Sequence, residues 1–209
     1  MIKLKIIDNF LQASDFKKIS KVALEKIGKK DIKVYHNSIV GNKVLNSECI
    51  KSDFLIELNK KYHSKAINIL QKLNKEKVKL YDYSEFHIIE TGANCSFPIH
   101  DDTPNKLLSG VIYLKPNKNY GTSFFSSKNG KSKKTIPWKL NRAVFFSRKE
   151  RESWHSYQGD GKSNRIVLVY NLMTKNIKGA LEAEKKSYFV GNLRYKLNPY
   201  IYKFFNKTI

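Results

Sequence analysis

The feature that most constrains the fold is a change of residue pattern near position 78. Before it, apolar residues recur at three- and four-residue steps; after it, short apolar or alternating runs are separated by turn residues. Many short strands with frequent turns are typical of a sandwich or barrel. We therefore predict an α+β chain that is mainly β, in which N-terminal helices buttress one sheet.

The predicted strands follow from this pattern. In the first part of the chain, residues 2–7 and 32–35 are expected to be strands and residues 36–41 a loop. In the second part, the predicted strands are 78–90, 106–114, 121–127, 133–136, 142–148, 152–157 and 165–173.

Two helices are predicted before the strands. Ser14 is a candidate N-cap, and the apolar residues that follow it at helical spacing reach Ile27, where Gly28 would end the helix. Ser52 opens a longer amphipathic pattern that extends to about Asn74. The first third of the chain is therefore expected to be largely helical.

The length of 209 residues fits a single domain over 1–209. We divide it into a helical N-terminal support at 1–76, a β core at 77–175 and a C-terminal aromatic extension at 176–209. We interpret the extension as a lid or a packing element. Its aromatic residues are Tyr188, Phe189, Tyr195, Tyr200, Tyr202, Phe204 and Phe205.

The net charge of the chain is +22. Such a charge fits a polyanionic partner, either nucleic acid or an anionic surface. Of the 40 basic residues, however, 35 are Lys and five are Arg, and the Lys residues are dispersed along the chain. Because Lys, Asn and Ile have A/T-rich codons, genome bias is the second explanation, and both stay open. In either case we expect weak association with nucleic acid that falls as salt rises.

Several patterns bear on the compartment. Met1–Asp8 is too short and too charged for a signal peptide, and no run of about eighteen apolar residues predicts a membrane span. Cys49 and Cys95 lie outside any zinc-type spacing and are expected to be free thiols in a reducing environment. We therefore expect a cytoplasmic protein without a membrane partner.

One short motif points to chemistry. On an extended strand, residues two apart point to the same side, about 6–7 Å from each other, so His100 and Asp102 can hold one metal ion while Asp101 points away. His155, on another predicted strand, would supply the third ligand. Two histidines and one carboxylate form the facial triad of mononuclear iron, which leaves metal positions open, whereas a structural site tends to close with four ligands.

A single Arg lies ten residues after the second His. Arg165 begins a predicted strand that is otherwise apolar, and a guanidinium is costly to bury unless it is paired. A cosubstrate carboxylate is a suitable partner, since the guanidinium fork binds it bidentately. The strand antiparallel to this one is expected to end near His155, which would place Arg165 beside the metal site.

The order and spacing of these residues resemble the iron(II)- and 2-oxoglutarate-dependent dioxygenases, in particular their prolyl 4-hydroxylase-like branch. The resemblance covers about residues 80–173. The segments that carry it are His100–Pro104, Leu108–Leu114, Gly121–Thr122, Asn141–Phe146, Trp154–His155 and Arg165.

The resemblance implies a double-stranded β-helix core, also described as jelly-roll or cupin-like. It implies that His100, Asp102 and His155 bind iron(II), with no catalytic side chain beyond these ligands. Arg165 would pair with the distal carboxylate of 2-oxoglutarate, and Tyr113 would hydrogen-bond to it. Molecular oxygen would be the second cosubstrate and ascorbate a reductant.

Two positions depart from the family pattern. Glu90 stands where some members place a Tyr that contacts the cosubstrate, and a carboxylate there would repel 2-oxoglutarate, so either the register differs or Glu90 points away. Asn171 stands where nucleic-acid demethylases of the superfamily carry a second Arg. This disfavours a DNA-repair function despite the basic charge. We retain Asn171 as a candidate contact of the cosubstrate.

The leading hypothesis is therefore a hydroxylase that acts on a prolyl or other peptidyl residue, with a small molecule or a nucleotide base as further substrate classes. The alternative is a basic nucleic-acid- or surface-binding module on a degenerate oxygenase fold; a decayed site would be expected to lose a ligand. A metal hydrolase of cupin shape would not need Arg165. A halogenase is disfavoured because Asp102 occupies the position that halide would require.

Overall fold

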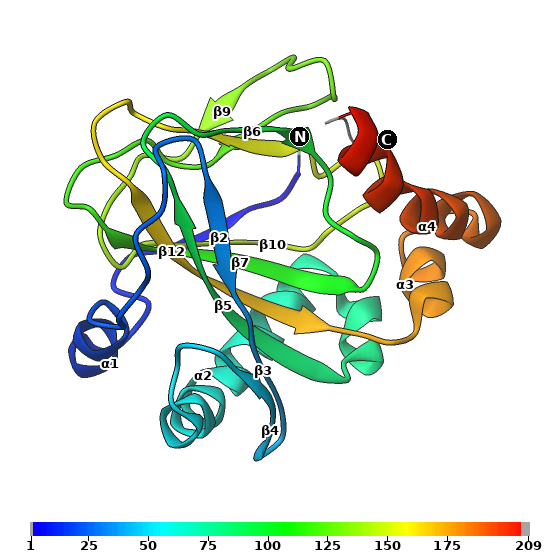
Figure 1. Ribbon diagram of the computed structural model, residues 1–209. Coiled ribbons are helices and arrows are strands. Elements are labelled where there is room, and N and C mark those ends of the chain that lie inside the picture. The colour runs from blue at the N-terminus through cyan, green and yellow to red at the C-terminus, as the bar shows by residue number, and fades with distance from the viewer. Residues whose placement is uncertain (1, 206–209) are drawn as a thin grey trace.

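Two antiparallel sheets form the centre of the molecule in this computed structural model (Figure 1). The structure describes the backbone of residues 2–205, and the side chains up to residue 197 and at residue 200. The larger sheet has the order β1-β10-β7-β12-β5-β3-β4, and β2 also pairs with β5. The smaller sheet has the order β6-β11-β8-β9.

From β5 onward the chain passes back and forth between the two sheets. The larger sheet consists of β1 (Lys5–Ile7), β2 (Ile32–Tyr35), β3 (Asn37–Val40), β4 (Lys43–Ser47), β5 (Tyr83–Thr91), β7 (Lys106–Lys115), β10 (Ala143–Phe146) and β12 (Arg165–Met173). The smaller sheet consists of β6 (Ser96–His100), β8 (Ser123–Phe124), β9 (Lys134–Thr135) and β11 (His155–Gln158).

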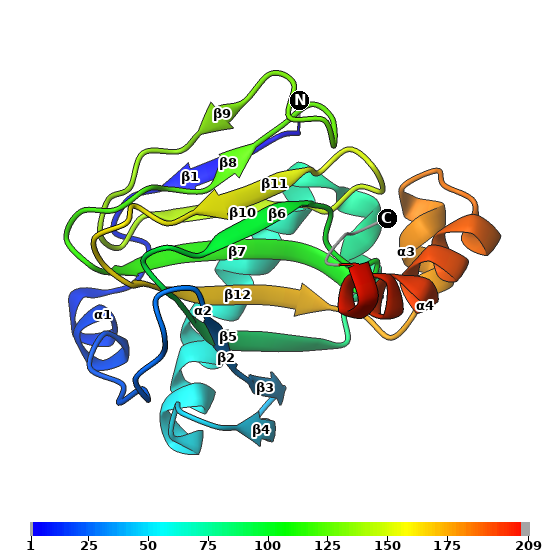
Figure 2. The ribbon, with the colours of Figure 1, turned by 45° about the horizontal axis from the view of Figure 1, so that its top comes forward.

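The two faces of the larger sheet have different partners. On its outer face, residues such as Ile112 and Leu168 pack with the buried face of helix α2 (Ser52–Leu73), including Leu55 and Ala66. The helix crosses behind this sheet in Figure 2. On the inner face, alternate residues of β7 and β12 form a second apolar cluster with the smaller sheet. This cluster contains Tyr113, Phe124, Ile136, Val144, Phe146 and Val167.

The long predicted helix and the longest strands match the sequence pattern closely. The helix expected from Ser52 to about Asn74 is observed over Ser52–Leu73, and the strand expected at 165–173 has those bounds in β12. Lys51, rather than a capping Ser, is the N-cap of α2, and no side chain caps it. The 3-10 helix η1 (Lys75–Leu80) occupies the start of the range 78–90, so β5 begins only at Tyr83.

The prediction of a helix from Ser14 to Ile27 is wrong in its second half. Helix α1 covers Ala13–Ile19 and is preceded by Gln12 as its N-cap. Beyond it a turn leads into residues 22–28, which form neither helix nor strand, with Val22 and Leu24 packed against the core and Ala23 exposed. Val22 and Leu24 thus contact the core from positions two residues apart, a spacing that does not place both on one face of a helix.

The N-terminal third is also less helical than expected. The loop predicted at 36–41 is instead part of the hairpin β3–β4, and strands β1, β2 and β3 pair with β10 or β5 of the large sheet. The buried amide of Asn37 organises this turn of the chain, since its Oδ1 accepts from the backbone N–H groups of Glu48, Cys49 and Ile50. The range 1–76 thus extends the sheet as well as supporting it.

The C-terminal extension forms two helices, α3 (Ile177–Ala183) and α4 (Tyr188–Phe205), at the end of β12. They pack closely, because a Cβ atom at Gly191 would lie 2.7 Å from Leu181. Phe189 and Tyr200 are exposed, and the side chains of Tyr202, Phe204 and Phe205 lie outside the described residues. A role of the extension as a lid stays a prediction. Among residues 2–205, no helix has the length and apolar character to cross a bilayer.

Candidate metal centre

His100, Asp102 and His155 converge at one end of the smaller sheet. His100 is the last residue of β6 and His155 the first of β11, and the two are directly opposite each other in this antiparallel pair. One ligand atom of each of the three residues lies within 4.8 Å of the others. The structure therefore brings together the three side chains that the sequence predicts as metal ligands.

Asp102 reaches this position from a loop, and not from a strand as the spacing argument assumed. Strand β6 ends at His100, and residues 101–105 form the connection to β7. Two residues of β7 fix the carboxylate: Lys106 Nζ donates to Oδ1 at 2.6 Å and Ser109 Oγ donates to Oδ2 at 2.6 Å. Burial raises the pKa of Asp102, but the charge and hydrogen bond of Lys106 together with the two neighbouring histidines outweigh burial, so its pKa lies below the usual value.

Both histidines are oriented by backbone carbonyl groups two residues before them. His100 Nδ1 lies 3.0 Å from the carbonyl of Pro98, and His155 Nδ1 lies 2.8 Å from that of Ser153. Each Nδ1 therefore donates its proton, which leaves Nε2 as the ligand atom. Burial lowers the pKa of both rings, that of His100 to about 3, so both imidazoles are neutral and able to bind a metal.

Aromatic side chains from both sheets enclose the two imidazoles. Phe97 packs edge-on to His100, with ring centroids 4.5 Å apart, and Phe146 packs on His155 at 5.0 Å. Phe124, on the neighbouring strand β8, lies 5.9 Å from the ring of His155. These rings hold the ligands in fixed orientations and surround the site with apolar atoms.

Asp101 points away from the other three, as predicted. Its Oδ2 accepts from the backbone N–H of Arg151 at 2.7 Å, and its Oδ1 accepts from the hydroxyl of Ser153. Asp101 therefore connects the loop after β6 to the loop before β11.

Arg165 begins β12 and is almost completely buried, with 6% of its surface exposed. Its Nη2 donates to Thr122 Oγ1 at 3.1 Å, but its buried Nε has no partner. The guanidinium carbon lies 4.0 Å from the ring centroid of Tyr157. Among the described residues, no carboxylate forms an ion pair with Arg165. Burial lowers the pKa of Arg165, yet a guanidinium stays charged. The structure therefore buries a cation that has no anionic partner among the described residues.

A cavity of about 240 Å³ joins the three candidate ligands to Arg165. Its walls come from both sheets, including the N-terminal strand β2 of the larger sheet. The apolar wall consists of Ile32, Val34, Ile89, Phe97, Val111, Phe146, Val167 and Val169. The polar wall includes His100, Asp102, Lys106, Ser109, Thr122, His155, Tyr157 and Arg165. The cavity thus has carboxylate and imidazole donors in one part and an unpaired guanidinium in another.

Tyr113 and Asn171, the other two candidates for contacts with the cosubstrate, lie outside the lining of the cavity. Tyr113 is fully buried, its ring stacks on Trp138, and its hydroxyl accepts from the backbone N–H of Thr122 at 2.9 Å. Asn171 is near the opposite end of β12 from Arg165, and its amide donates to Glu85 at 3.1 Å. Neither side chain lines the cavity. A direct contact of either with the cosubstrate stays a prediction.

Glu90 does not face the cavity, so its carboxylate would not repel 2-oxoglutarate there. On β5 the neighbouring residues Ile89 and Thr91 line the cavity, whereas Glu90 does not. Its carboxylate instead accepts from Asn164 Nδ2 at 2.9 Å. The alternation of side chains along the strand therefore turns this negative charge away from the site.

Four polar residues of the site were not predicted from the sequence: Lys106, Ser109, Thr122 and Tyr157. Lys106 and Ser109 follow Asp102 by four and seven residues, which is close enough to have suggested a contact had the loop been foreseen. Thr122 belongs to one of the segments of the resemblance and Tyr157 to none, but no local pattern predicts their contacts with Arg165, which depend on the folding of distant segments onto one another.

Comparison with solved structures identifies the fold. The chain resembles a Pseudomonas putida prolyl-4-hydroxylase with a TM-score of 0.56 and 13% identity, over 84% of this chain and 94% of the other. It resembles an oxidoreductase of the 2OG-Fe(II) oxygenase family from Burkholderia pseudomallei with a TM-score of 0.57 and 15% identity, over 81% of this chain and 84% of the other. The chain has the fold of 2OG-Fe(II) oxygenases.

No protein-family model and no curated protein matches the sequence. The resemblance inferred from the order of a few motifs is nevertheless confirmed at the level of the oxygenase fold, which extends over most of the chain. At this low identity the structural likeness carries the fold, and the chemistry of the site depends on this chain's own residues.

Proposed function

We propose that this protein is an iron(II)- and 2-oxoglutarate-dependent dioxygenase. The observation that carries the proposal is one cavity that contains both His100, Asp102 and His155 and the unpaired guanidinium of Arg165. Two neutral imidazoles and one carboxylate are the donor set of the non-haem iron(II) oxygenases. Iron(II) bound there would activate molecular oxygen, with 2-oxoglutarate as the cosubstrate that is oxidised to succinate, for hydroxylation of a C–H bond of the substrate.

Each residue has a role that follows from its position. His100 and His155 would bind the metal through Nε2, and Asp102 would bind it through a carboxylate oxygen that now accepts from Lys106 or Ser109. Arg165 would take the distal carboxylate of 2-oxoglutarate, which would satisfy its buried charge. The apolar wall would exclude water from the reacting groups.

The order of the strands supports a double-stranded β-helix. From β5 to β12, the strands β5, β7, β10 and β12 belong to the larger sheet, and β6, β8, β9 and β11 to the smaller one. We infer that these eight strands are the jelly-roll core, with β1–β4 as an extension of the larger sheet. The division into support, core and aromatic extension, and the cytoplasmic location, stay predictions.

The substrate class we propose is a prolyl or other peptidyl residue, with a small molecule as the second class. One of the two structural neighbours is a prolyl-4-hydroxylase, and the sequence resemblance is to the same branch. The substrate would have to approach the metal through the part of the cavity that the cosubstrate leaves free. Ascorbate would be expected to restore activity after unproductive cycles.

The decisive experiment uses anaerobic protein loaded with iron(II) and 2-oxoglutarate. We expect a weak visible charge-transfer absorption and, after oxygen is added, formation of succinate. Asp102→Ala should abolish both signals, whereas Asp53→Ala, which removes an exposed carboxylate from α2, should leave both unchanged. Addition of proline-containing peptides should accelerate succinate formation if the substrate is peptidyl.

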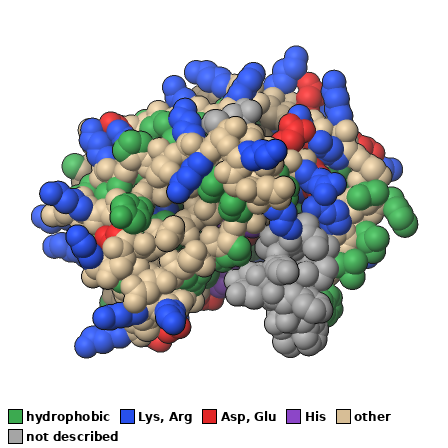
Figure 3. Space-filling view, turned by 90° about the horizontal axis from the view of Figure 1, so that it is seen from above, with side chains coloured by type: hydrophobic (Ala, Val, Ile, Leu, Met, Phe, Trp, Pro, Cys, Tyr) green, Lys and Arg blue, Asp and Glu red, His purple; other side chains and the backbone are tan. Residues whose placement is uncertain are grey.

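The charge of +22 favours one second candidate, a nucleic-acid-binding module on the same fold. On the face seen in Figure 3, Lys and Arg side chains are spread around the molecule and do not form one continuous patch. Absence of the absorption band and of succinate, together with salt-dependent binding of DNA or RNA, would favour this candidate over the enzyme.

A further inference from the structure

A buried cluster of charged side chains lies behind the candidate metal centre, between its loops and the C-terminal helices. It contains three cations and three carboxylates, which are Lys77, Arg148, Arg194, Asp101, Glu150 and Glu184. Lys77, Arg148 and Glu184 are each no more than 3% exposed. Such a cluster is costly to desolvate, so its retention raises the question of what it positions.

Arg148 is the centre of this cluster. Its Nη1 donates to Glu184 Oε2 at 2.6 Å, and its Nη2 donates to Glu150. Its Nε donates to the backbone carbonyl of Asp102 at 2.9 Å. One planar guanidinium therefore holds the main chain of a candidate metal ligand and the C-cap residue of α3 at the same time.

The other members of the cluster attach this arrangement to the rest of the fold. Lys77, on η1, donates to Glu184 at 2.6 Å and to the carbonyl of Arg148 at 2.5 Å. Glu184 Oε2 also accepts from the backbone N–H of Glu150 at 2.7 Å, and Arg194 of α4 pairs with Glu150. The residues that follow β10 are thus fixed to both C-terminal helices.

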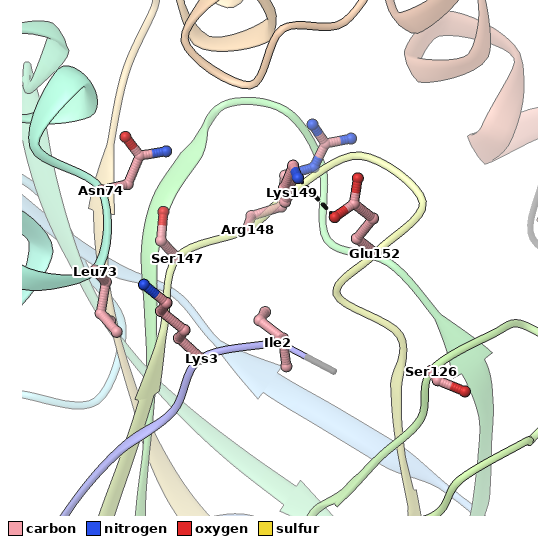
Figure 4. A pocket seen from close by; sticks show the side chains of 9 residues that line it. All are labelled: Ile2, Lys3, Leu73, Asn74, Ser126, Ser147, Arg148, Lys149 and Glu152. Atoms are coloured by element: carbon pink, nitrogen blue, oxygen red, sulfur yellow. Dashed lines mark ion pairs between the residues drawn. The ribbon is translucent and has the colours of Figure 1, made fainter.

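The loop before β11, which leads to the candidate ligand His155, joins the cluster through Asp101. The carboxylate of Asp101 lies 3.8 Å from Arg148 and accepts from the hydroxyl of Ser153, whose carbonyl in turn accepts from His155 Nδ1. Asp102 and His155 therefore have separate connections to the same guanidinium. Arg148 also lines a different cavity, shown in Figure 4, where Lys149 and Glu152 form an ion pair.

We propose that Arg148 is a positioning residue for the metal site, which couples the docking of α3 to the geometry of Asp102 and His155. Arg148 does not face the metal cavity and takes no part in the chemistry itself. It acts by fixing the loop that carries Asp102, in the way that outer residues orient metal ligands. The C-terminal helices are then part of the metal site's support, although they contribute no ligand.

The test is a titration of the anaerobic full-length protein with Co(II), which reports ligand geometry through its visible ligand-field bands. Arg148→Lys keeps a cation beside Glu150 and Glu184 but lacks the fork that reaches the carbonyl of Asp102. We expect it to weaken Co(II) binding by about 10- to 100-fold and to change the bands. Glu184→Gln should act in the same direction. The control Arg142→Lys, which alters an ion pair with Asp8 far from this cluster, should change neither.

This inference rests on the proposed metal site, and the outcomes separate the two. Wild-type protein that binds no Co(II) would overturn the metal site and the positioning role with it. Wild-type binding together with a folded Arg148→Lys variant of unchanged affinity and spectrum would overturn the positioning role alone.

Hydrogen exchange of the wild-type protein gives a second measurement that needs no variant. Because coupling is reciprocal, Co(II) should slow exchange of the amides that close α3 at Glu184 and Lys185, and should leave the hairpin of Asn37–Ser47 nearly unchanged. Equal effects on the two regions, or no effect on α3, would overturn the coupling even if Arg148→Lys failed to fold.

Discussion

Lys106 donates to Oδ1 of Asp102 at 2.6 Å, so the carboxylate of the candidate metal site already holds an ammonium group. A divalent metal on Asp102 would therefore bind beside a positive charge. Lys106→Met should remove this repulsion and tighten Co(II) binding by about tenfold, or about 1.4 kcal/mol. Isothermal titration at low salt would measure it.

The matched control for this change is Lys115→Met, at the exposed end of the same strand β7. It should leave Co(II) affinity unchanged. Weaker binding by the Lys106 variant would mean that the ammonium orients Asp102 more than it repels the metal, which is the opposite of our expectation.

Arg165 allows a prediction in which stability and binding change in opposite ways. Arg165→Met removes a buried cation that has no anionic partner among the described residues, so the ligand-free protein should be as stable as the wild type or more so. The same variant should lose the rise in melting temperature that 2-oxoglutarate gives the metal-loaded wild type. Differential scanning fluorimetry with and without 2-oxoglutarate measures both effects.

Arg142→Met serves as the control for Arg165, because Arg142 already pairs with Asp8 at the surface. It should retain the full response to 2-oxoglutarate. A response of normal size in Arg165→Met would show that another group binds the distal carboxylate.

Lys77 and Glu184 form a buried ion pair, and removal of either charge should destabilise the protein because the other is then buried without its partner. Glu184→Gln leaves Lys77 without its ion-pair partner in a site from which water is excluded, and should cost about 3–5 kcal/mol of unfolding free energy. The double variant Lys77→Met/Glu184→Gln should recover part of this loss. Urea unfolding of both single variants and the double variant gives the coupling energy.

An exposed ion pair on helix α3, of which Glu184 is the C-cap residue, provides the comparison. Lys178 and Glu182 lie 3.9 Å apart and are more than half exposed, so Glu182→Gln should change stability by less than about 0.5 kcal/mol. If Glu184→Gln proved as mild as Glu182→Gln, the buried cluster would be a weak contributor to folding.

The surroundings of Asp15 predict that part of the protein's stability depends on pH in the acid range. Asp15 is buried, with 2% of its surface exposed. Burial raises the pKa of its carboxyl group, but the hydrogen bonds from Lys61 and Tyr62 and the charge of Lys61 together outweigh burial, so the pKa lies below its usual value of 3.8. A lowered pKa in the folded state stabilises the protein above the unfolded value and loses that contribution as pH falls through the folded value. Asp15→Asn should therefore destabilise the protein at pH 7 by about 1–3 kcal/mol and progressively less below pH 4.

Urea unfolding at pH 7 and at several values below pH 4 would test this dependence. Glu76→Gln, at an exposed position of η1, is the control and should show little difference at any pH. A destabilisation by Asp15→Asn that stays constant down to the lowest pH would argue against the ionised contact.

The parts of the fold that sequence predicts best are those where one physical signal dominates. β12 is apolar on both faces, and α2 has a continuous apolar stripe, so their bounds are found within a residue or two. The hairpin β3–β4 was missed because its pattern is mixed: Ile39 is fully buried, but most of its other residues are not. Pairing with β5 and the amide of Asn37, neither visible locally, determine its structure.

The candidate site divides in the same way. The candidate ligands and Arg165 could be predicted from order and spacing. The contacts of Lys106 and Ser109 with Asp102 were not, because they depend on a loop between β6 and β7 whose course the spacing argument replaced with a strand. The cluster around Arg148 joins residues 77, 101, 148 and 184, and no sequence periodicity relates them.

Strand β2 has a consequence for how such a protein can diversify. Ile32 and Val34 contribute to the wall of the cavity from an edge strand that precedes the proposed core and supplies none of the candidate metal ligands. Insertions or replacements in this stretch could reshape what the cavity accepts while leaving the metal chemistry intact. Related chains could therefore acquire new preferences by exchanging one peripheral ribbon.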